Sequence, residues 1–173
     1  MASPDSNSLI GWIKAFLIAI ILAIVLNAFI FSSSIVEGIS MEPTLLDGDR
    51  IIFNKLIYII SKPERGDIIM IQQDNKNYVK RVIGLPGESI EMKNHELYID
   101  NKVYPQTYVD RHGDILTGSF GPTQIPTEHY FVMGDNRAVS KDSRNGLGLI
   151  KEDNIIGQSE FIIYPFDHLS KTK

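Results

Sequence analysis

The sequence predicts a mostly β domain preceded by one N-terminal transmembrane helix. Two observations carry this prediction. One long apolar run occupies residues 9–31, and the rest of the chain holds short segments rich in Ile, Val, Tyr and Phe that are separated by turn formers. We therefore expect a short N-terminal segment at 1–8, an anchor at 9–31 and a folded domain at 32–173.

The apolar run has the composition of a membrane-spanning helix. It reads LIGWIKAFLIAIILAIVLNAFIF, with Lys14 as its one charged residue. A helix of this length extends about 34 Å, enough to cross a hydrocarbon core of about 30 Å. Trp12 and Lys14 lie near its first end, where an indole and a long ammonium side chain suit a membrane interface. These features favour an anchor in a lipid bilayer.

Two other interpretations of this run compete. A helix buried in the domain core is disfavoured because the run is apolar on all faces. A cleavable secretory signal is the closer rival, since three serines follow at 32–34. The apolar region of such signals covers about 7–15 residues, however, and this run is longer. We expect a retained anchor. The few flanking basic residues favour an N-terminus inside the cell only weakly.

Composition argues against several classes of function. The formal net charge of −4 disfavours nucleic acid as a partner, because phosphate binding needs a concentrated basic surface. The chain has no cysteine, which excludes disulfides and thiolate metal sites. The four histidines are far apart, at positions 95, 112, 129 and 168, so no metal site is expected.

The body of the chain reads as a series of short strands bounded by turn formers. Asp100-Asn101 is expected to form a two-residue hairpin turn. Residues 54–60 form either a helical turn or a strand, and the Gly- and Pro-rich stretch 110–127 is expected to be a surface loop. Strands are expected at 50–53, 67–72, 78–85, 89–92, 96–99, 130–133 and 155–163.

Ser40 is a candidate nucleophile because it lies in a turn. It follows Gly38 and precedes Pro43, a pattern that is also typical of a purely structural turn. A hydroxyl becomes a nucleophile only when a base takes its proton. No histidine lies in a segment that looks buried, so a base other than histidine is needed.

Lys80 is the candidate base. It lies in the apolar segment YVKRVIGL at 78–85, and burial of an ammonium lowers its pKa toward roughly 7–8. Strand alternation places Lys80 on the face of Tyr78 and Val82, with Arg81 on the other face. A lysine that protects an edge strand from aggregation explains the same pattern. The residues alone leave both interpretations open.

A third window is dense in polar side chains. Residues 134–144 read GDNRAVSKDSR, with acidic, basic and hydroxyl groups in close succession. Such a segment suits a hydrogen-bonded and ion-paired network that holds a loop in one geometry. A solvated turn is the alternative, because Gly-Asp-Asn is typical of turns.

Together these windows resemble type I signal peptidases of the compact Gram-positive type, the serine peptidases that remove signal peptides from exported proteins. The resemblance covers most of the chain. It rests on the anchor, SMEPTL at 40–45, RGDI at 65–68, YVKRVIG at 78–84 and the 134–144 window. It implies a catalytic core of coiled antiparallel β-sheets. It also implies a single-pass plasma-membrane protein with a cytoplasmic N-terminus and an extracytoplasmic catalytic domain.

The resemblance also implies residue roles. Ser40 would be the nucleophile and Lys80 the neutral general base, while Ser140 would hydrogen-bond and orient the lysine amine. Gly38 stands where some members carry a serine that adds a second oxyanion donor. The residues expected to brace the loop through ion pairs are Asp135, Asp142 and Arg144.

The implied substrates are secretory preproteins with small residues, usually Ala, at positions −1 and −3 before the cut. Met41 and Val79 are candidates for the pocket walls that exclude larger side chains. No metal or organic cofactor is required, and the protein is expected to work near the export translocon.

Two rival interpretations remain. Self-cleaving repressors share serine–lysine chemistry, but they are soluble and carry a DNA-binding segment where this chain has its apolar run. A non-catalytic, membrane-tethered β-module is the other. The joint presence of Ser40, Lys80 and Ser140 argues against it.

Overall fold

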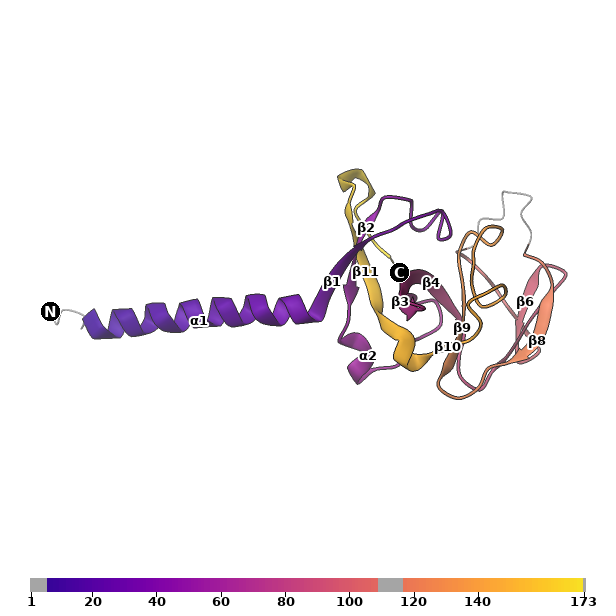
Figure 1. Ribbon diagram of the computed structural model, residues 1–173, viewed down its shortest axis with the longest axis horizontal. Helices are drawn as coiled ribbons and strands as arrows, with labels where there is room; N and C mark the ends of the chain where they lie inside the picture. The colour runs from indigo at the N-terminus through magenta and orange to yellow at the C-terminus, as the bar shows by residue number, and fades with distance from the viewer. Residues whose placement is uncertain (1–5, 109–116, 173) are drawn as a thin grey trace.

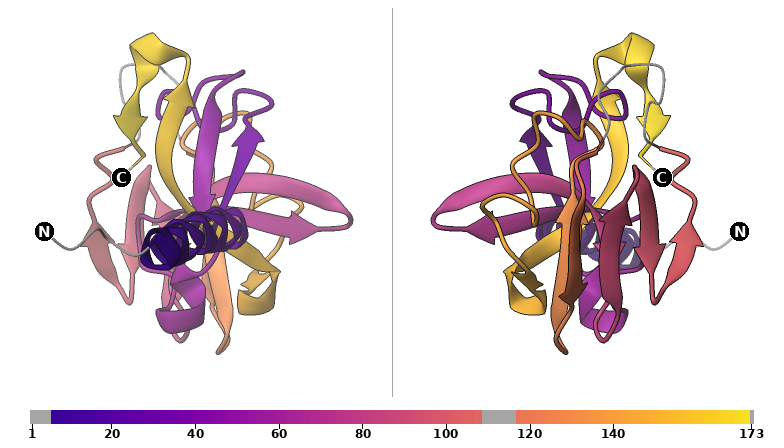
Figure 2. Two further views of the ribbon diagram at one scale, coloured as in Figure 1. Left: turned by 90° about the vertical axis from the view of Figure 1, so that its left-hand side faces the viewer. Right: turned by 90° about the vertical axis from the view of Figure 1, so that its right-hand side faces the viewer.

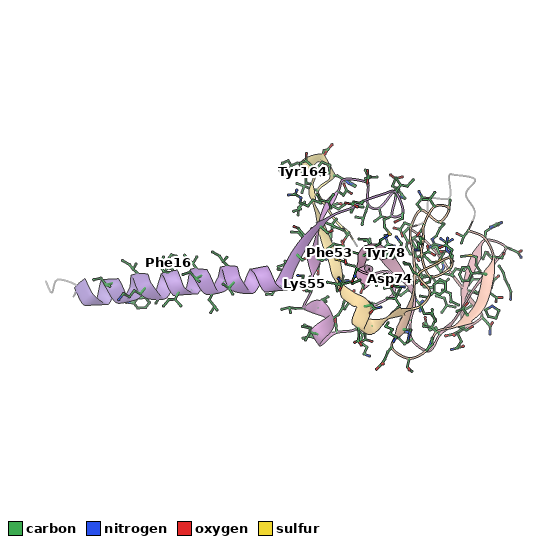
Figure 3. The ribbon with its side chains drawn as sticks, viewed as in Figure 1. Phe16, Phe53, Lys55, Asp74, Tyr78 and Tyr164 are labelled. Atoms are coloured by element: carbon green, nitrogen blue, oxygen red, sulfur yellow. The ribbon has the colours of Figure 1, made fainter. Side chains whose placement is uncertain are left out.

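A long N-terminal helix stands out from a β-rich body in the computed structural model, which describes residues 6–108 and 117–172 (Figure 1). Helix α1 spans Ser6–Ile30, close to the expected 9–31. All of its described side chains between residues 10 and 25 are exposed, including Phe16, which contacts no other element (Figure 3). Within the described part of the chain, no helix is long and apolar enough to cross a membrane.

The body consists of two antiparallel sheets. The larger has the strand order β1-β2-β11-β3-β4-β9-β10, with β12 paired to β11. Its strands are β1 (Phe31–Ile35), β2 (Arg50–Asn54), β3 (Ile68–Gln73), β4 (Lys76–Gly84), β9 (His129–Met133), β10 (Ile150–Lys151), β11 (Ile155–Tyr164) and β12 (Ser170–Lys171).

The smaller sheet has the order β7-β6-β5-β8 and lies at the end of the body away from α1 (Figures 1 and 2). Its strands are β5 (Ser89–Lys93), β6 (Glu96–Ile99), β7 (Lys102–Tyr104) and β8 (Phe120–Gln124). Three short helical turns complete the described chain, α2 (Ile57–Ile60), η1 (Glu152–Asn154) and η2 (Phe166–His168).

The expected mostly β class and most of the expected strands are confirmed. The hairpin turn is confirmed as well, because Asp100 and Asn101 both adopt positive φ, at 49° and 62°, between β6 and β7. The 54–60 segment holds the helical turn α2. The expected surface loop at 110–127 is wrong in part, because β8 forms within it and pairs with β5. Residues 110–116 of that loop lie outside the described residues.

Strand β4 lies inside the larger sheet. It pairs with β3 on one side, where Lys80 is opposite Ile69, and with β9 on the other, where Arg81 is opposite Met133. Its residues from Lys80 to Gly84 are all buried. The alternative of an edge-strand lysine at position 80 is therefore wrong: the side chain is enclosed by neighbouring elements, and its amine has to be accommodated away from bulk water.

Candidate active site

Ser40 lies on the loop between β1 and β2, and this loop is fixed to the core. At its base, Val36 N donates to Asp49 O at 2.8 Å. Within it, Leu45 N donates to Met41 O at 3.0 Å, and the side chains of both residues are buried in one hydrophobic cluster. The residue that follows the serine is thus anchored in the core. This anchoring fixes where the Ser40 side chain can lie.

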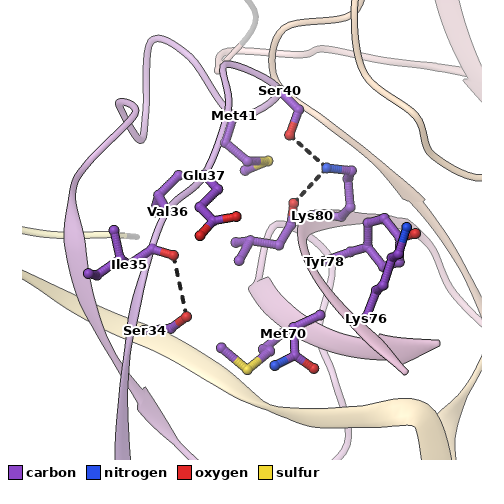
Figure 4. A pocket seen from close by; sticks show the side chains of 12 residues that line it. Ser34, Ile35, Val36, Glu37, Ser40, Met41, Met70, Lys76, Tyr78 and Lys80 are labelled. Carbon is purple, nitrogen blue, oxygen red and sulfur yellow. Dashed lines mark hydrogen bonds between the residues drawn. The ribbon is translucent and has the colours of Figure 1, made fainter. Parts of the chain in front are cut away.

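Lys80 reaches Ser40 from β4. Its Nζ lies 2.7 Å from Ser40 Oγ and 2.9 Å from Val79 O (Figure 4). The residue is 3% exposed, and burial lowers its pKa to about 8, although the carboxylates of Asp142 and Asp135 act in the opposite direction. At that pKa about a tenth of the amine is neutral at pH 7. The two side chains selected from the sequence therefore meet at hydrogen-bond distance.

Asp142 holds together the loop formed by residues 134–144. Nε and Nη2 of Arg144 each donate to one of its carboxylate oxygens at 2.8 Å, and Gly134 N donates to Oδ2 at 3.0 Å. Burial alone would raise the pKa of Asp142. The hydrogen bond and charge of Arg144 outweigh it, so the pKa lies below its ordinary value. The carboxylate stays ionised, and the loop keeps a bidentate ion pair at its centre.

A second bidentate ion pair joins the 134–144 loop to β4. Arg81 donates from Nε to Asp135 Oδ1 at 2.9 Å and from Nη2 to Oδ2 at 2.7 Å. Thr44 Oγ1 also donates to Asp135 Oδ2, at 2.5 Å. Since Thr44 belongs to the Ser40 loop, Asp135 connects that loop to β4. The backbone adds a further link, because Asn136 N donates to Ser40 O at 3.1 Å.

Sequence reasoning anticipated ion pairs at Asp135 and Asp142 but missed two of the groups that complete them. The sequence predicts only that Arg81 faces away from Lys80, and it gives Thr44 no role beyond its place in the SMEPTL window. A buried arginine needs a partner, so the apolar residues Val79, Val82 and Ile83 around Arg81 on β4 were a usable signal. Nothing in the pattern around Thr44 pointed to Asp135, which lies 91 positions further along the chain.

Ser140 does not make the bond to Lys80 that the resemblance implied. The residue is fully buried, yet Oγ has no hydrogen-bond partner within the described residues. The hydroxyl instead lies against Gly134, where an added Cβ would stand 2.3 Å from Ser140 Oγ and 2.3 Å from Ser40 O. It is near enough to Asp142 to help lower the pKa of that carboxyl, although it falls short of hydrogen-bond geometry.

An open cleft of about 580 Å³ leads away from the Ser40–Lys80 pair. One wall comes from β1 and the residues after it, and the other comes from β3 and β4 (Figure 4). Both pocket candidates, Met41 and Val79, line it. The lining residues are Ser34, Ile35, Val36, Glu37, Ser40, Met41, Met70, Lys76, Asn77, Tyr78, Val79 and Lys80.

Gly38 lies two residues before the candidate nucleophile, where a serine would add a second oxyanion donor. Gly38 has φ of +84°, and its N–H donates to Asp47 Oδ1 at 2.6 Å. With no side chain, this position supplies no hydroxyl near Ser40.

Among residues 6–108 and 117–172, no three His, Asp or Glu side chains are grouped so as to hold a metal ion.

Comparison with known proteins assigns a family to this arrangement. The family described as "Signal peptidase, peptidase S26" matches residues 9–164. Signal peptidase I of Bacillus licheniformis is 47% identical, over 99% of this chain and 97% of that protein. Signal peptidase I T of Bacillus subtilis (strain 168) is 45% identical, over 99% of this chain and 94% of that protein.

A solved structure agrees with the sequence comparisons. The crystal structure of a signal peptidase I from Enterococcus faecalis V583 is 32% identical and matches with a TM-score of 0.50. The match covers 57% of this chain and 97% of that one. The family match, the two relatives and the solved structure agree with one another. The chain therefore belongs to the peptidase S26 family of signal peptidases, and it is a serine peptidase that cleaves signal peptides.

Proposed function

We propose that Ser40 and Lys80 carry out this cleavage, with Ser40 as nucleophile and the neutral amine of Lys80 as general base. One observation carries the proposal: the Nζ of a buried lysine lies 2.7 Å from the serine Oγ. A general base must be within hydrogen-bond reach of the proton that it removes and have a pKa near the working pH. A pKa of about 8 for Lys80 meets the second condition.

The chemistry proceeds in two halves. Lys80 takes the proton of Ser40 as Oγ attacks the carbonyl carbon of residue −1, and the resulting ammonium gives that proton to the departing amine. An ester between Ser40 and the signal peptide remains. Lys80, neutral again, takes a proton from a water molecule that attacks the ester. That proton returns to Ser40 Oγ as the signal peptide leaves with a free carboxylate.

The backbone N–H of Ser40 supplies the oxyanion donor in this proposal. It donates to no acceptor within the described residues, so it is available to the developing negative charge. A donor already aimed at that charge contributes ~3 kcal/mol. The hydrogen bond from Asn136 N to Ser40 O helps to fix the peptide orientation at this position.

The substrates are secretory preproteins, cut after small residues at −1 and −3. Met41 and Val79 support this preference because both line the cleft beside the reactive pair, Met41 being 1% exposed and Val79 packed against the same hydrophobic cluster. Walls made of packed side chains exclude larger substrate side chains by overlap.

The 134–144 loop has a positioning role in this proposal. Asp142 with Arg144, and Asp135 with Arg81, hold the loop against β4 and the Ser40 loop. Ser140 fills the space behind Gly134, beside the carbonyl of Ser40. These groups hold Ser40 Oγ and Lys80 Nζ within hydrogen-bond distance of one another.

Cleavage of a preprotein with Ala at −1 and −3 tests the assignment. Lys80→Met keeps an apolar side chain of similar length in the buried site and lowers kcat by about 10²–10⁴-fold, the usual contribution of a general base. Ser40→Ala gives no acyl-enzyme and no mature product. The rates are measured in nonionic detergent from the appearance of the mature protein.

Exposed residues of the same types serve as controls for these substitutions. Lys102→Met and Ser119→Ala, both at exposed positions, retain the wild-type rate. Wild-type activity in Lys80→Met would refute the assigned base. A folded wild type that cuts no preprotein would favour the non-catalytic β-module.

Gly134→Ala tests whether the loop positions the reactive pair. A Cβ at this position would stand 2.3 Å from both Ser40 O and Ser140 Oγ, so the serine backbone has to move. Displacements of about 1 Å at a reacting group cost up to about 10²-fold in rate, and we expect a roughly 10- to 100-fold lower kcat/KM. Gly118→Ala, where an added Cβ meets nothing within 4 Å, is the matched control. Equal activity of the two variants would contradict the positioning role.

We further propose that residues 9–31 anchor the protein in the plasma membrane, with residues 1–8 in the cytoplasm and the catalytic domain, 32–173, on the extracytoplasmic face. The apolar run and the exposure of the described α1 side chains support this arrangement. Lipid would cover these side chains, and the short connection to Ser40 would keep the cut close to the bilayer and the export translocon.

Fractionation of membranes tests the anchor. The full chain is expected to stay in the membrane pellet after extraction at high pH, whereas a chain lacking residues 1–31 is released. External protease added to spheroplasts should digest the 32–173 domain while an epitope at the N-terminus is protected. Release of the full chain by high pH would contradict the anchor, and a protected catalytic domain would contradict its orientation.

A further inference from the structure

Two charged residues of the cleft have no part in the proposed chemistry. Glu37 lies on the wall that follows β1, and Lys76 lies on the opposite wall at the start of β4. Both side chains are exposed, and within the described residues neither forms an ion pair or a side-chain hydrogen bond. Each therefore presents an uncompensated charge to whatever occupies the cleft.

The backbone on either side of Glu37 is fixed. Val36 N donates to Asp49 O at 2.8 Å, and Gly38 N donates to Asp47 Oδ1 at 2.6 Å. In Figure 4 the Glu37 side chain points from its wall into the cleft. The backbone of Glu37 is consequently held at one place beside the cleft, and it does not belong to a freely moving loop.

The two charges lie on different segments of the chain beside the reactive pair. Lys76 is four residues before Lys80 on β4, which corresponds to about 13 Å along a strand at about 3.3 Å per residue. Glu37 lies three residues before Ser40, on the loop that carries the nucleophile and forms the opposite wall of the cleft. A substrate extended along β4 with residue −1 at Lys80 brings residue −5 near Lys76, and the residues in between pass Glu37.

Alternation along the substrate decides which side chains meet these charges. In an extended chain, successive side chains point to opposite faces. If the small residues at −1 and −3 face the packed walls, residue −2 faces the open side, where Glu37 is exposed. A charged side chain at residue −2 of the substrate can then interact with Glu37 without entering the packed part of the cleft.

We infer that Glu37 and Lys76 select substrates by charge, Glu37 favouring a basic side chain at −2 and Lys76 an acidic one at −5. This inference rests on the proposed function, because it places residue −1 at Ser40 and Lys80. Exposed charge pairs contribute modestly, so selection changes relative rates and does not decide whether cleavage occurs. The preference is also expected to weaken as added salt screens the charges.

Peptides that differ only at position −2 test the inference. Full-length enzyme in nonionic detergent is given substrates with Ala at −1 and −3 and Lys, Gln or Glu at −2. For the wild type we expect kcat/KM to be about two- to tenfold higher with Lys than with Glu. Glu37→Gln should bring this ratio close to one, and Glu37→Lys should reverse it. Raising the salt to about 0.5 M should reduce the wild-type ratio, at a Debye length of about 4 Å.

Lys76→Gln is the matched control, since it changes a charge on the opposite wall of the same cleft. It should leave the ratio at −2 unchanged and remove the preference for Glu over Lys at −5. Cleavage of the Gln peptide reports separately on the reactive pair in every variant. Failure of the wild type to cut that peptide would refute the proposed function. Normal cutting with the same Lys-to-Glu ratio in wild type and Glu37→Gln would refute charge selection alone.

Discussion

The burial of one amine on β4 is the constraint on which the site depends. A buried ammonium is unfavourable unless a counter-charge or several hydrogen bonds compensate it. In the part of the chain that the structure describes, Lys80 Nζ has two hydrogen-bond partners, Ser40 Oγ and Val79 O, and neither carries a charge. Burial therefore lowers the pKa of Lys80 to about 8, into the range where a lysine can act as a base. The amine thus takes the role that histidine has in the more common serine peptidases.

The two carboxylates near the lysine are held by other cations. Asp142 and Asp135 act to raise the pKa of Lys80, but each is engaged in a bidentate ion pair, with Arg144 and with Arg81 respectively. These pairs join the 134–144 loop, β4 and the Ser40 loop into one unit. The same contacts that fix the geometry thus pair both carboxylates with arginines. Burial therefore remains the larger effect on the pKa of Lys80. Arg81 and Arg144 thus both hold the site together and pair the carboxylates that would otherwise favour a charged Lys80.

Local patterns predicted much of this molecule. Alternating β-formers and turn residues indicated most strands, and the Asp100-Asn101 turn was recognised because such residues tolerate positive φ. The pairings between distant segments were beyond local reasoning. Strand β8 was missed because FGPTQ carries a Gly and a Pro, and it is stabilised as a strand by pairing with β5. The contact of Thr44 with Asp135 likewise depends on how remote loops meet, as does the Ser140 hydroxyl, which has no hydrogen-bond partner among the described residues.

The dependence of kcat/KM on pH tests a neutral lysine base most directly. The base must be deprotonated in the free enzyme, and burial lowers the pKa of Lys80 from 10.5 to about 8. With a single uncharged peptide as substrate, kcat/KM should rise about tenfold per pH unit below about pH 8 and level off above it. A rate that is independent of pH between about 6 and 10, or that rises with an inflection near the ordinary lysine pKa of 10.5, would show that neutral Lys80 is not the base.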